Sequence, residues 1–157
     1  MIPYLDKSMP DVWQAARAWS AVAAEAALVH GLTGQETELI KVRASQLNAC
    51  AYCLDLHSRE ARKAGIPQQK LDMLPAWRDA ELYDERERAV LAIAEAATRL
   101  PLTEDSRADL VGAHTVLGEP AFAAAEWIAV AINTFNRVSI LSGHPVNPRD
   151  REGRLLR

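Results

Sequence analysis

The sequence predicts an all-α protein that folds as a compact multi-helix domain. Apolar residues recur at intervals of three and four along the chain, and alanine is abundant, as in amphipathic helices. We find no alternation of apolar and polar residues that would indicate a half-buried strand. Of the 157 residues, 49% are apolar and 25% are charged, which is enough apolar content for one soluble domain with a real core.

Start and stop signals define the first two helices. Pro10 opens a helix that runs to a stop near Gly31, because proline suits the first turn of a helix and glycine the position after the last. Thr33 is the expected N-cap of the second helix, with Glu36 three positions on as its capping-box partner. Together the two helices cover most of residues 10–47.

The third helix carries both cysteines of the chain. We expect Asn48 to cap its start and Gly65-Ile66-Pro67 to end it. A short helix over about 68–73 follows, and then a loop that holds Pro75 and Trp77.

The second half of the chain predicts three longer helices. Asp84 starts the first, and the DERER run that begins there is expected to be a solvated first turn. Thr103 starts the next, and the last spans about 120–142. The polar tail, about 144–157, is expected to be partly disordered or laid over a neighbour. We assign the whole chain, 1–157, to one domain with its core at about 10–145.

Charge and hydropathy argue against several classes of partner. A formal net charge of −3 disfavours nucleic acid or an anionic membrane as the main partner. The N-terminus lacks the basic start and apolar run of a signal peptide, and no uncharged apolar run is long enough to span a membrane. We therefore expect a cytoplasmic protein, in which a permanent structural disulfide would be unusual.

The segment ACAYCLDLH holds the two cysteines of the chain, Cys50 and Cys53, followed by His57. At about 100° per residue, all three side chains fall on one face of a helix. The start of a helix stabilises a thiolate, since free backbone N–H groups and the helix dipole favour an anion there. His57 lies one turn after Cys53 and is placed to take its proton, which would make the pair redox-active.

Two other interpretations of this motif remain open. A CxxC pair can be half of a zinc site, but structural zinc usually has four ligands, and a fourth would have to be a carboxylate from another helix. The cysteines can also pack simply as small apolar residues. A thioredoxin-like interpretation needs a βαβ context, which this chain lacks.

The longer stretch ETELIKVRASQLNACAYCLDLHSREARKAG resembles the core motif of the carboxymuconolactone decarboxylase family, in its alkylhydroperoxidase D-like (AhpD-like) branch. That motif has a glutamate, a CxxC pair twelve residues later and a histidine four residues past the second cysteine. Glu38, Cys50, Cys53 and His57 match these four positions. In the best-known branch a histidine stands just before the second cysteine, where this chain has Tyr52.

The resemblance extends over roughly residues 10–145, because the later segments WRDAELYDERERAVLAIAEAATRL and AINTFNRVSI also look like helices of the family. It implies an all-helical domain that assembles into trimers or hexamers. It also implies a thiol-dependent peroxidase without metal or organic cofactor, with a hydroperoxide as substrate and an external dithiol as reductant. The decarboxylase branch lacks the cysteine pair, so decarboxylation is a poor guide to activity here. A dithiol–disulfide oxidoreductase and a redox sensor without sustained turnover are the alternatives.

In the leading hypothesis, Cys53 attacks the peroxide and Cys50 then resolves the product to a disulfide. Cys53 is activated by His57 and, through it, by Glu38, which would orient the ring and stabilise its protonated form. The helix dipole would instead favour Cys50 as the first nucleophile, so the order of the two cysteines stays open.

The other polar and aromatic residues are interpreted as structural. The last helix is apolar on nearly every face, which favours burial against other subunits. A polar island on that helix is expected to be a satisfied buried network, formed by Asn133, Asn136 and Arg137. The histidines outside the motif are expected to be structural or solvated, since nothing pairs them with a nucleophile. They are His30, His114 and His144.

Overall fold

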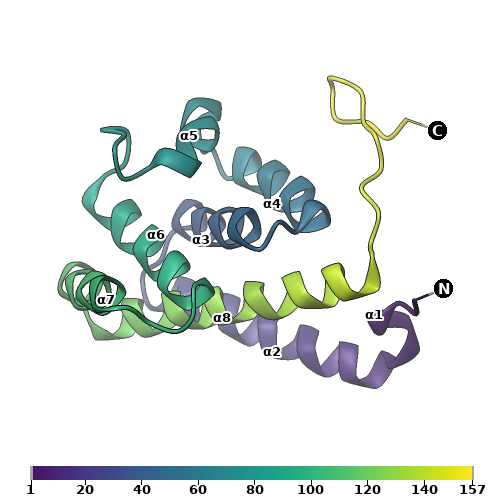
Figure 1. Cartoon of the computed structure of the whole chain (residues 1–157), viewed down its shortest axis with the longest axis horizontal. Coiled ribbons are helices and arrows are strands. Elements are labelled where there is room, and N and C mark those ends of the chain that lie inside the picture. Colours follow the sequence, from purple (N-terminus) through teal and green to yellow (C-terminus); the bar gives the residue numbers. More distant parts are fainter. Residues whose placement is uncertain (1, 157) are drawn as a thin grey trace.

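Eight α-helices and one short 3-10 helix make up most of the structure, a computed structural model that describes residues 2–156 (Figure 1). In chain order they are α1 (Leu5–Ser8), α2 (Pro10–Val29), α3 (Gly34–Leu47), α4 (Ala51–Lys63), α5 (Gln68–Met73), η1 (Leu74–Ala76), α6 (Glu85–Thr98), α7 (Glu104–Leu117) and α8 (Glu119–Ser142). Across residues 2–156 no strand is formed, and one isolated bridge joins Arg149 to Leu155. The all-α prediction is confirmed.

Most of the predicted helix starts are confirmed in atomic detail. Thr33 caps α3, because its Oγ1 accepts the Glu36 backbone N–H at 3.0 Å while the Glu36 carboxylate accepts the Thr33 N–H at 2.8 Å. Asp84 and Thr103 form the same reciprocal cap at the starts of α6 and α7. Local side chains therefore fix where these helices begin.

Helix α8 is the element around which the others pack. It contacts α1, α2, α3, α4, α6 and α7, and in Figure 1 it runs along the length of the molecule with α2 beside it. Small residues such as Ala125 and Ala129 are fully buried on it, which lets neighbouring helices approach closely. The ends of α3 and α4 that carry the candidate site are held against this helix.

The prediction of a solvated first turn for α6 is wrong. Glu87 is buried and accepts hydrogen bonds from Lys70 Nζ at 2.6 and 2.7 Å. Arg86 Nε donates to the buried Glu36 carboxylate at 2.7 Å. These charges are paired because this turn packs against α3 and the start of α5, a contact that the DERER run does not encode by itself.

Helix α1 was not expected from the sequence. Its single turn is too short for a periodic pattern, and it is fixed by a distant partner. The Leu5 backbone N–H donates to Ser142 Oγ, 137 residues away, at 3.0 Å. The first and last helices therefore meet, and both described ends of the chain lie on the same side of the molecule (Figure 1).

The polar tail follows α8 and lies over α4. Arg149 Nε stands 3.7 Å from Asp55 Oδ2 of α4. A turn beyond it is closed by Asp150, whose carboxylate accepts the backbone N–H groups of Glu152 and Arg154. Of the helices described between residues 2 and 156, none combines the length and apolar character needed to cross a bilayer.

Candidate active site

The two cysteines lie at a sharp turn between α3 and α4. Asn48 is the C-cap of α3, so its prediction as the N-cap of the cysteine helix is wrong, and the N-cap is Cys50. Between them, Ala49 adopts a φ of 52°, in the left-handed region that commonly terminates helices. Because this residue ends α3, the next helix begins two residues later than the capping pattern suggests.

Cys50 and Cys53 are joined by a disulfide with their Cα atoms 5.3 Å apart. Cys50 Sγ also accepts the backbone N–H of Cys53 at 3.4 Å, which makes sulfur the capping atom of α4. Both residues are almost completely shielded, with 1% and 3% of their surface exposed. A pair one helical turn apart can open and close its bond with little backbone movement, as the spacing predicts.

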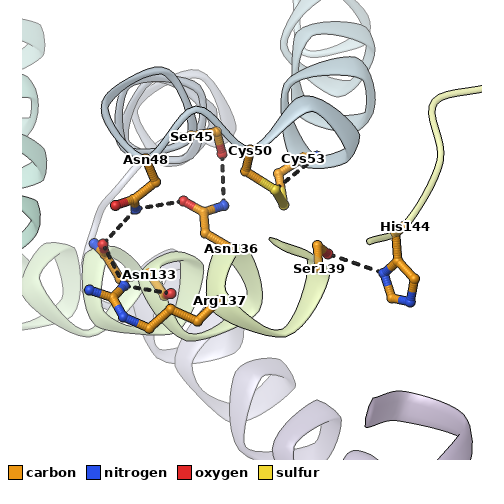
Figure 2. Close-up of a disulfide and its surroundings, with 9 residues drawn as sticks. All are labelled: Ser45, Asn48, Cys50, Cys53, Asn133, Asn136, Arg137, Ser139 and His144. Atoms are coloured by element: carbon orange, nitrogen blue, oxygen red, sulfur yellow. Dashed lines mark hydrogen bonds between the residues drawn. A yellow bond between two sulfur atoms is a disulfide. The ribbon is translucent and has the colours of Figure 1, made fainter. Parts of the chain in front are cut away.

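A network of amides fixes the cysteine turn to α8 (Figure 2). Asn136 donates to Ser45 Oγ at 3.1 Å, and its own Oδ1 accepts from Asn48 Nδ2 at 2.9 Å. Asn48 Nδ2 also donates to Asn133 Oδ1 at 2.8 Å. The predicted buried network is confirmed for both α8 asparagines, and it holds the chain on the N-terminal side of Cys50.

A carboxylate–histidine pair joins α3 to α4. Glu38 Oε2 lies 3.0 Å from His57 Nδ1, and the other oxygen, Oε1, accepts from Lys41 Nζ at 2.8 Å. Both side chains are mostly buried, with 12% of Glu38 and 15% of His57 exposed. The fold therefore brings together two of the four motif residues that the sequence separates by 19 positions.

Glu38 is held in its ionised form. Burial opposes ionisation, but the hydrogen bonds and positive charges of His57 and Lys41 outweigh it, so the pKa of Glu38 is lowered from its ordinary value. An ionised carboxylate favours a proton on the facing Nδ1 of His57. Nε2 then becomes the ring atom that can accept a proton from another group.

The four predicted site residues thus form two pairs that share helix α4, Cys50 with Cys53 and Glu38 with His57. Within the described part of the chain, no group of three or more His, Cys, Asp or Glu side chains is arranged to hold a metal ion. Sequence reasoning missed the supporting role of Ser45 and Asn48. Their partner Asn136 is 91 and 88 residues away, so no local spacing could reveal it.

Sequence comparisons find known proteins that resemble this chain over about half or more of its length, or over a shorter segment. The profile of the carboxymuconolactone decarboxylase family matches residues 14–96, more than half of the chain. The uncharacterised protein YdfG of Bacillus subtilis is 37% identical over 109 residues, which cover 68% of this chain and 73% of that protein. The uncharacterised Escherichia coli protein YnjA is 33% identical over 67 residues, or 43% of this chain and 37% of that protein.

A crystal structure from Agrobacterium tumefaciens shares the fold. It is of a protein of unknown function, provisionally described as the antioxidant defence protein AhpD. The two structures superpose with a TM-score of 0.78 at 29% sequence identity, over 90% of this chain and 95% of the other.

Proposed function

The chain belongs to the carboxymuconolactone decarboxylase family, and from this membership and the site geometry we propose that it is a thiol-dependent peroxidase of the AhpD-like type. In this proposal a hydroperoxide oxidises the Cys50–Cys53 pair, and an external dithiol reduces it again. The cycle needs no metal or organic cofactor. We place it in the cytoplasm, where dithiol reductants keep thiols reduced.

The observation that carries the proposal is the Glu38–His57 pair, in which Glu38 of α3 holds a histidine of α4, the helix that Cys50 caps and that contains Cys53. A disulfide pair alone is compatible with a structural role. A buried histidine with a carboxylate on one nitrogen, one turn after a cysteine, is the arrangement that activates a thiol nucleophile. The AhpD description of the Agrobacterium protein supports the same reaction class.

The first step oxidises Cys53. His57 Nε2 takes the thiol proton, and the thiolate attacks one peroxide oxygen. An S–O bond forms as the O–O bond breaks, which leaves a sulfenic acid on Cys53. The alkoxide that leaves takes the proton back from His57 and departs as an alcohol.

The second step closes the disulfide. The sulfur of Cys50 attacks the sulfur of Cys53, so an S–S bond forms and the S–O bond breaks. Hydroxide leaves with the proton that Cys50 gives up, as water. The N–H of Cys53 points at the sulfur of Cys50 and stabilises its thiolate, which is the form that attacks in this step.

The third step restores the pair. One thiolate of the external dithiol attacks the disulfide and forms a mixed disulfide, and its second thiol displaces the protein sulfur. The reductant is oxidised to its own disulfide, and both cysteines recover a proton. The second candidate is a dithiol–disulfide oxidoreductase, for which a protein or small thiol is the partner and this third step is the physiological reaction. The Cys50–Cys53 pair, one helical turn apart and able to form a disulfide, supports it as it supports the peroxidase.

We also propose that the protein assembles as a trimer or hexamer. The support comes from α8, where Trp127 is 55% exposed between two apolar grooves of about 450 and 610 Å³. Val130 and Leu141 are exposed on the same helix. Such an apolar surface on a soluble domain is typical of a subunit contact.

A single-turnover thiol count tests the peroxidase. The protein is reduced, freed of reductant and metal, and mixed with one equivalent of an organic hydroperoxide, while peroxide and free thiols are followed together. The chain has two cysteines, so loss of both thiols reports on this pair. We expect both thiols to disappear as the peroxide is consumed. Survival of the peroxide with intact thiols would exclude this function, and faster reaction with a disulfide substrate would favour the second candidate.

A further inference from the structure

The site contains a second carboxylate–histidine pair that the motif does not include. His144, just after α8, places Nε2 3.1 Å from Asp6 Oδ1 of α1. Its geometry is close to that of the Glu38–His57 pair, which measures 3.0 Å. The shielding is also similar, with 13% of the His144 side chain and 21% of Asp6 exposed.

This second pair lies against the cysteine helix. The ring of His144 packs on Tyr52, the residue just before Cys53, with centroids 5.4 Å apart. Its Nδ1 is 3.4 Å from the hydroxyl of Ser139, a buried residue of α8. Figure 2 places Ser139 and His144 in the surroundings of the disulfide, on α8 and the segment that follows it.

The contacts of His144 come from three separate parts of the fold. Tyr4 and Asp6 belong to the N-terminal segment, Tyr52 to α4 and Ser139 to α8. A solvated histidine would not need a carboxylate on one nitrogen and a hydroxyl on the other. The structure thus holds this ring in one orientation, with both nitrogens engaged.

The dithiol cycle moves a proton at each of two cysteines, in two separate steps. Oxidation of two thiols by one hydroperoxide releases two thiol protons, which end on the alcohol and on water. Reduction of the disulfide by a dithiol returns two protons to the cysteines. His57 lies one turn after Cys53 on α4, whereas Cys50 precedes the first turn of that helix as its N-cap.

We propose that His144, oriented by Asp6, is the second proton carrier of this site and serves the cysteine pair through the Ser139 hydroxyl. During oxidation it takes the proton of the second thiol and passes it to the departing hydroxide, which leaves as water. During reduction it takes a proton from the external dithiol and gives it to the leaving thiolate. Asp6 holds the ring as Glu38 holds His57. The proposal rests on the function proposed above for the proton count, and it makes His144 and Asp6 positioning residues.

Within residues 2–156, the titratable side chains in contact with His144 are those of one aspartate and two tyrosines. Asp6 faces Nε2, and the rings of Tyr4 and Tyr52 pack against the imidazole. The Lys7 ammonium lies 4.8 Å from the centroid of Tyr4 and is the nearest cation of the same segment. If replacing His144 changes the pH dependence of disulfide reduction, only these few neighbouring groups need to be considered as other causes.

The test follows reduction of the disulfide by excess dithiothreitol from pH 5 to 9, in the wild type, His144→Gln and Asp6→Asn. The control is His30→Gln, which replaces an exposed histidine at the end of α2. We expect His144→Gln to slow reduction about 10-fold or more near neutral pH, as loss of a general acid does. The ratio of the wild-type rate to the His144→Gln rate should show a single transition between pH 5 and 9. The rate of His30→Gln should equal that of the wild type at every pH.

A structural role would give a different result. It would lower the melting temperature of His144→Gln but leave the shape of its pH profile unchanged, and that outcome would overturn the proposal. If His144→Gln does not fold, Asp6→Asn serves as the test, because it keeps a polar partner for His144. It should displace the midpoint of the pH profile of disulfide reduction.

A measurement on the wild type needs no variant. The NMR titration of the His144 ring should differ between the dithiol and disulfide forms, and an identical titration would also overturn the proposal. The dithiothreitol reaction uses no peroxide. If the wild type does not turn over peroxide but the pH profile of reduction shifts in His144→Gln, the peroxidase proposal fails and the second proton carrier stands. If the wild type turns over peroxide but the reduction profile of His144→Gln keeps its shape, the peroxidase stands and the second carrier fails.

Discussion

The side chains of Asn48 and Asn136, 88 residues apart in sequence, share a hydrogen bond of 2.9 Å. One residue ends the helix before the cysteines, and the other is fully buried in the C-terminal half of α8. Through this bond the position of the cysteine turn depends on the packing of the whole bundle.

Asn136→Ala tests that dependence. The change leaves Ser45 Oγ and the Asn48 amide short of a partner, so we expect a loss of about 1–3 kcal/mol in the free energy of unfolding. Chemical denaturation of both redox forms measures the loss. Asn147→Ala, at an exposed site in the tail, is the control and should have little effect. Equal stability of the two variants would show that the network does not support the turn.

Glu38→Gln tests the carboxylate and its pH dependence. The pKa of Glu38 is lowered in the folded protein from its ordinary value of 4.5, so its ionisation stabilises the fold above that pH. The stabilisation is lost as the pH falls through the lower, folded value. The stability gap between wild type and Glu38→Gln should therefore be full near neutral pH and shrink below about pH 4.5.

The same variant has a kinetic signature. We expect peroxide consumption to fall about 10-fold or more, since His57 loses the partner that orients it. Glu60→Gln is a matched control, because Glu60 lies on α4 and pairs with Lys63 near the surface. An unchanged pH–rate profile in Glu38→Gln would remove this residue from the mechanism.

Single serine replacements assign the order of the cysteines. If Cys53 attacks the peroxide, Cys50→Ser should consume one equivalent and stop at a sulfenic acid that dimedone traps. Cys53→Ser should consume no more peroxide than the variant in which both cysteines are replaced by serine. The opposite pattern would make Cys50 the first nucleophile, as its cap position favours.

Glu95→Gln probes a buried ion cluster away from the cysteines. The Glu95 carboxylate accepts from Arg43 Nη2 at 2.7 Å and from Trp77 Nε1 at 3.0 Å, and Arg43 is also buried. Loss of the charge leaves the guanidinium without its counter-ion, so we expect a cost of about 3 kcal/mol or more. Denaturation curves compare it with Glu81→Gln, an exposed site that should be neutral.

Trp127→Glu tests the proposed assembly. A carboxylate in the middle of the apolar α8 surface should dissociate the oligomer, and light scattering would show a smaller mass than for the wild type. A neutral change at the exposed Val111 of α7, Val111→Thr, serves as the control. A wild-type monomer would contradict the assembly at once.

The sequence predicted most of what local patterns encode. The caps at Thr33, Asp84 and Thr103 depend on residues three positions apart, and they were found. The family motif predicts that Glu38 and His57 meet, because α3 and α4 are neighbours in sequence and form a hairpin. The all-α fold class and the central contact of the motif can therefore be predicted from the sequence.

Contacts over long distances were not readable. Asn48 looked like a helix start, but Ala49 takes a left-handed conformation, and the asparagine side chain is used by α8 instead. For His144, expected to be structural or solvated, spacing does not reveal the partner Asp6, 138 residues away. The charges of DERER looked exposed, although Glu87 binds Lys70 from another helix. Each of these depends on tertiary packing, which residue spacing does not encode.

The cap of α4 is a sulfur atom, so the hydrogen bond of one backbone amide depends on the redox state of the cysteine pair. A thiolate accepts a hydrogen bond more strongly than the sulfur of a disulfide, so the N–H of Cys53 is held more firmly when the pair is reduced and Cys50 is ionised. Deuterium should replace this single amide hydrogen faster after oxidation than before it. Hydrogen exchange at one residue would then report how much of the protein is oxidised, with no added label and no change to the chain.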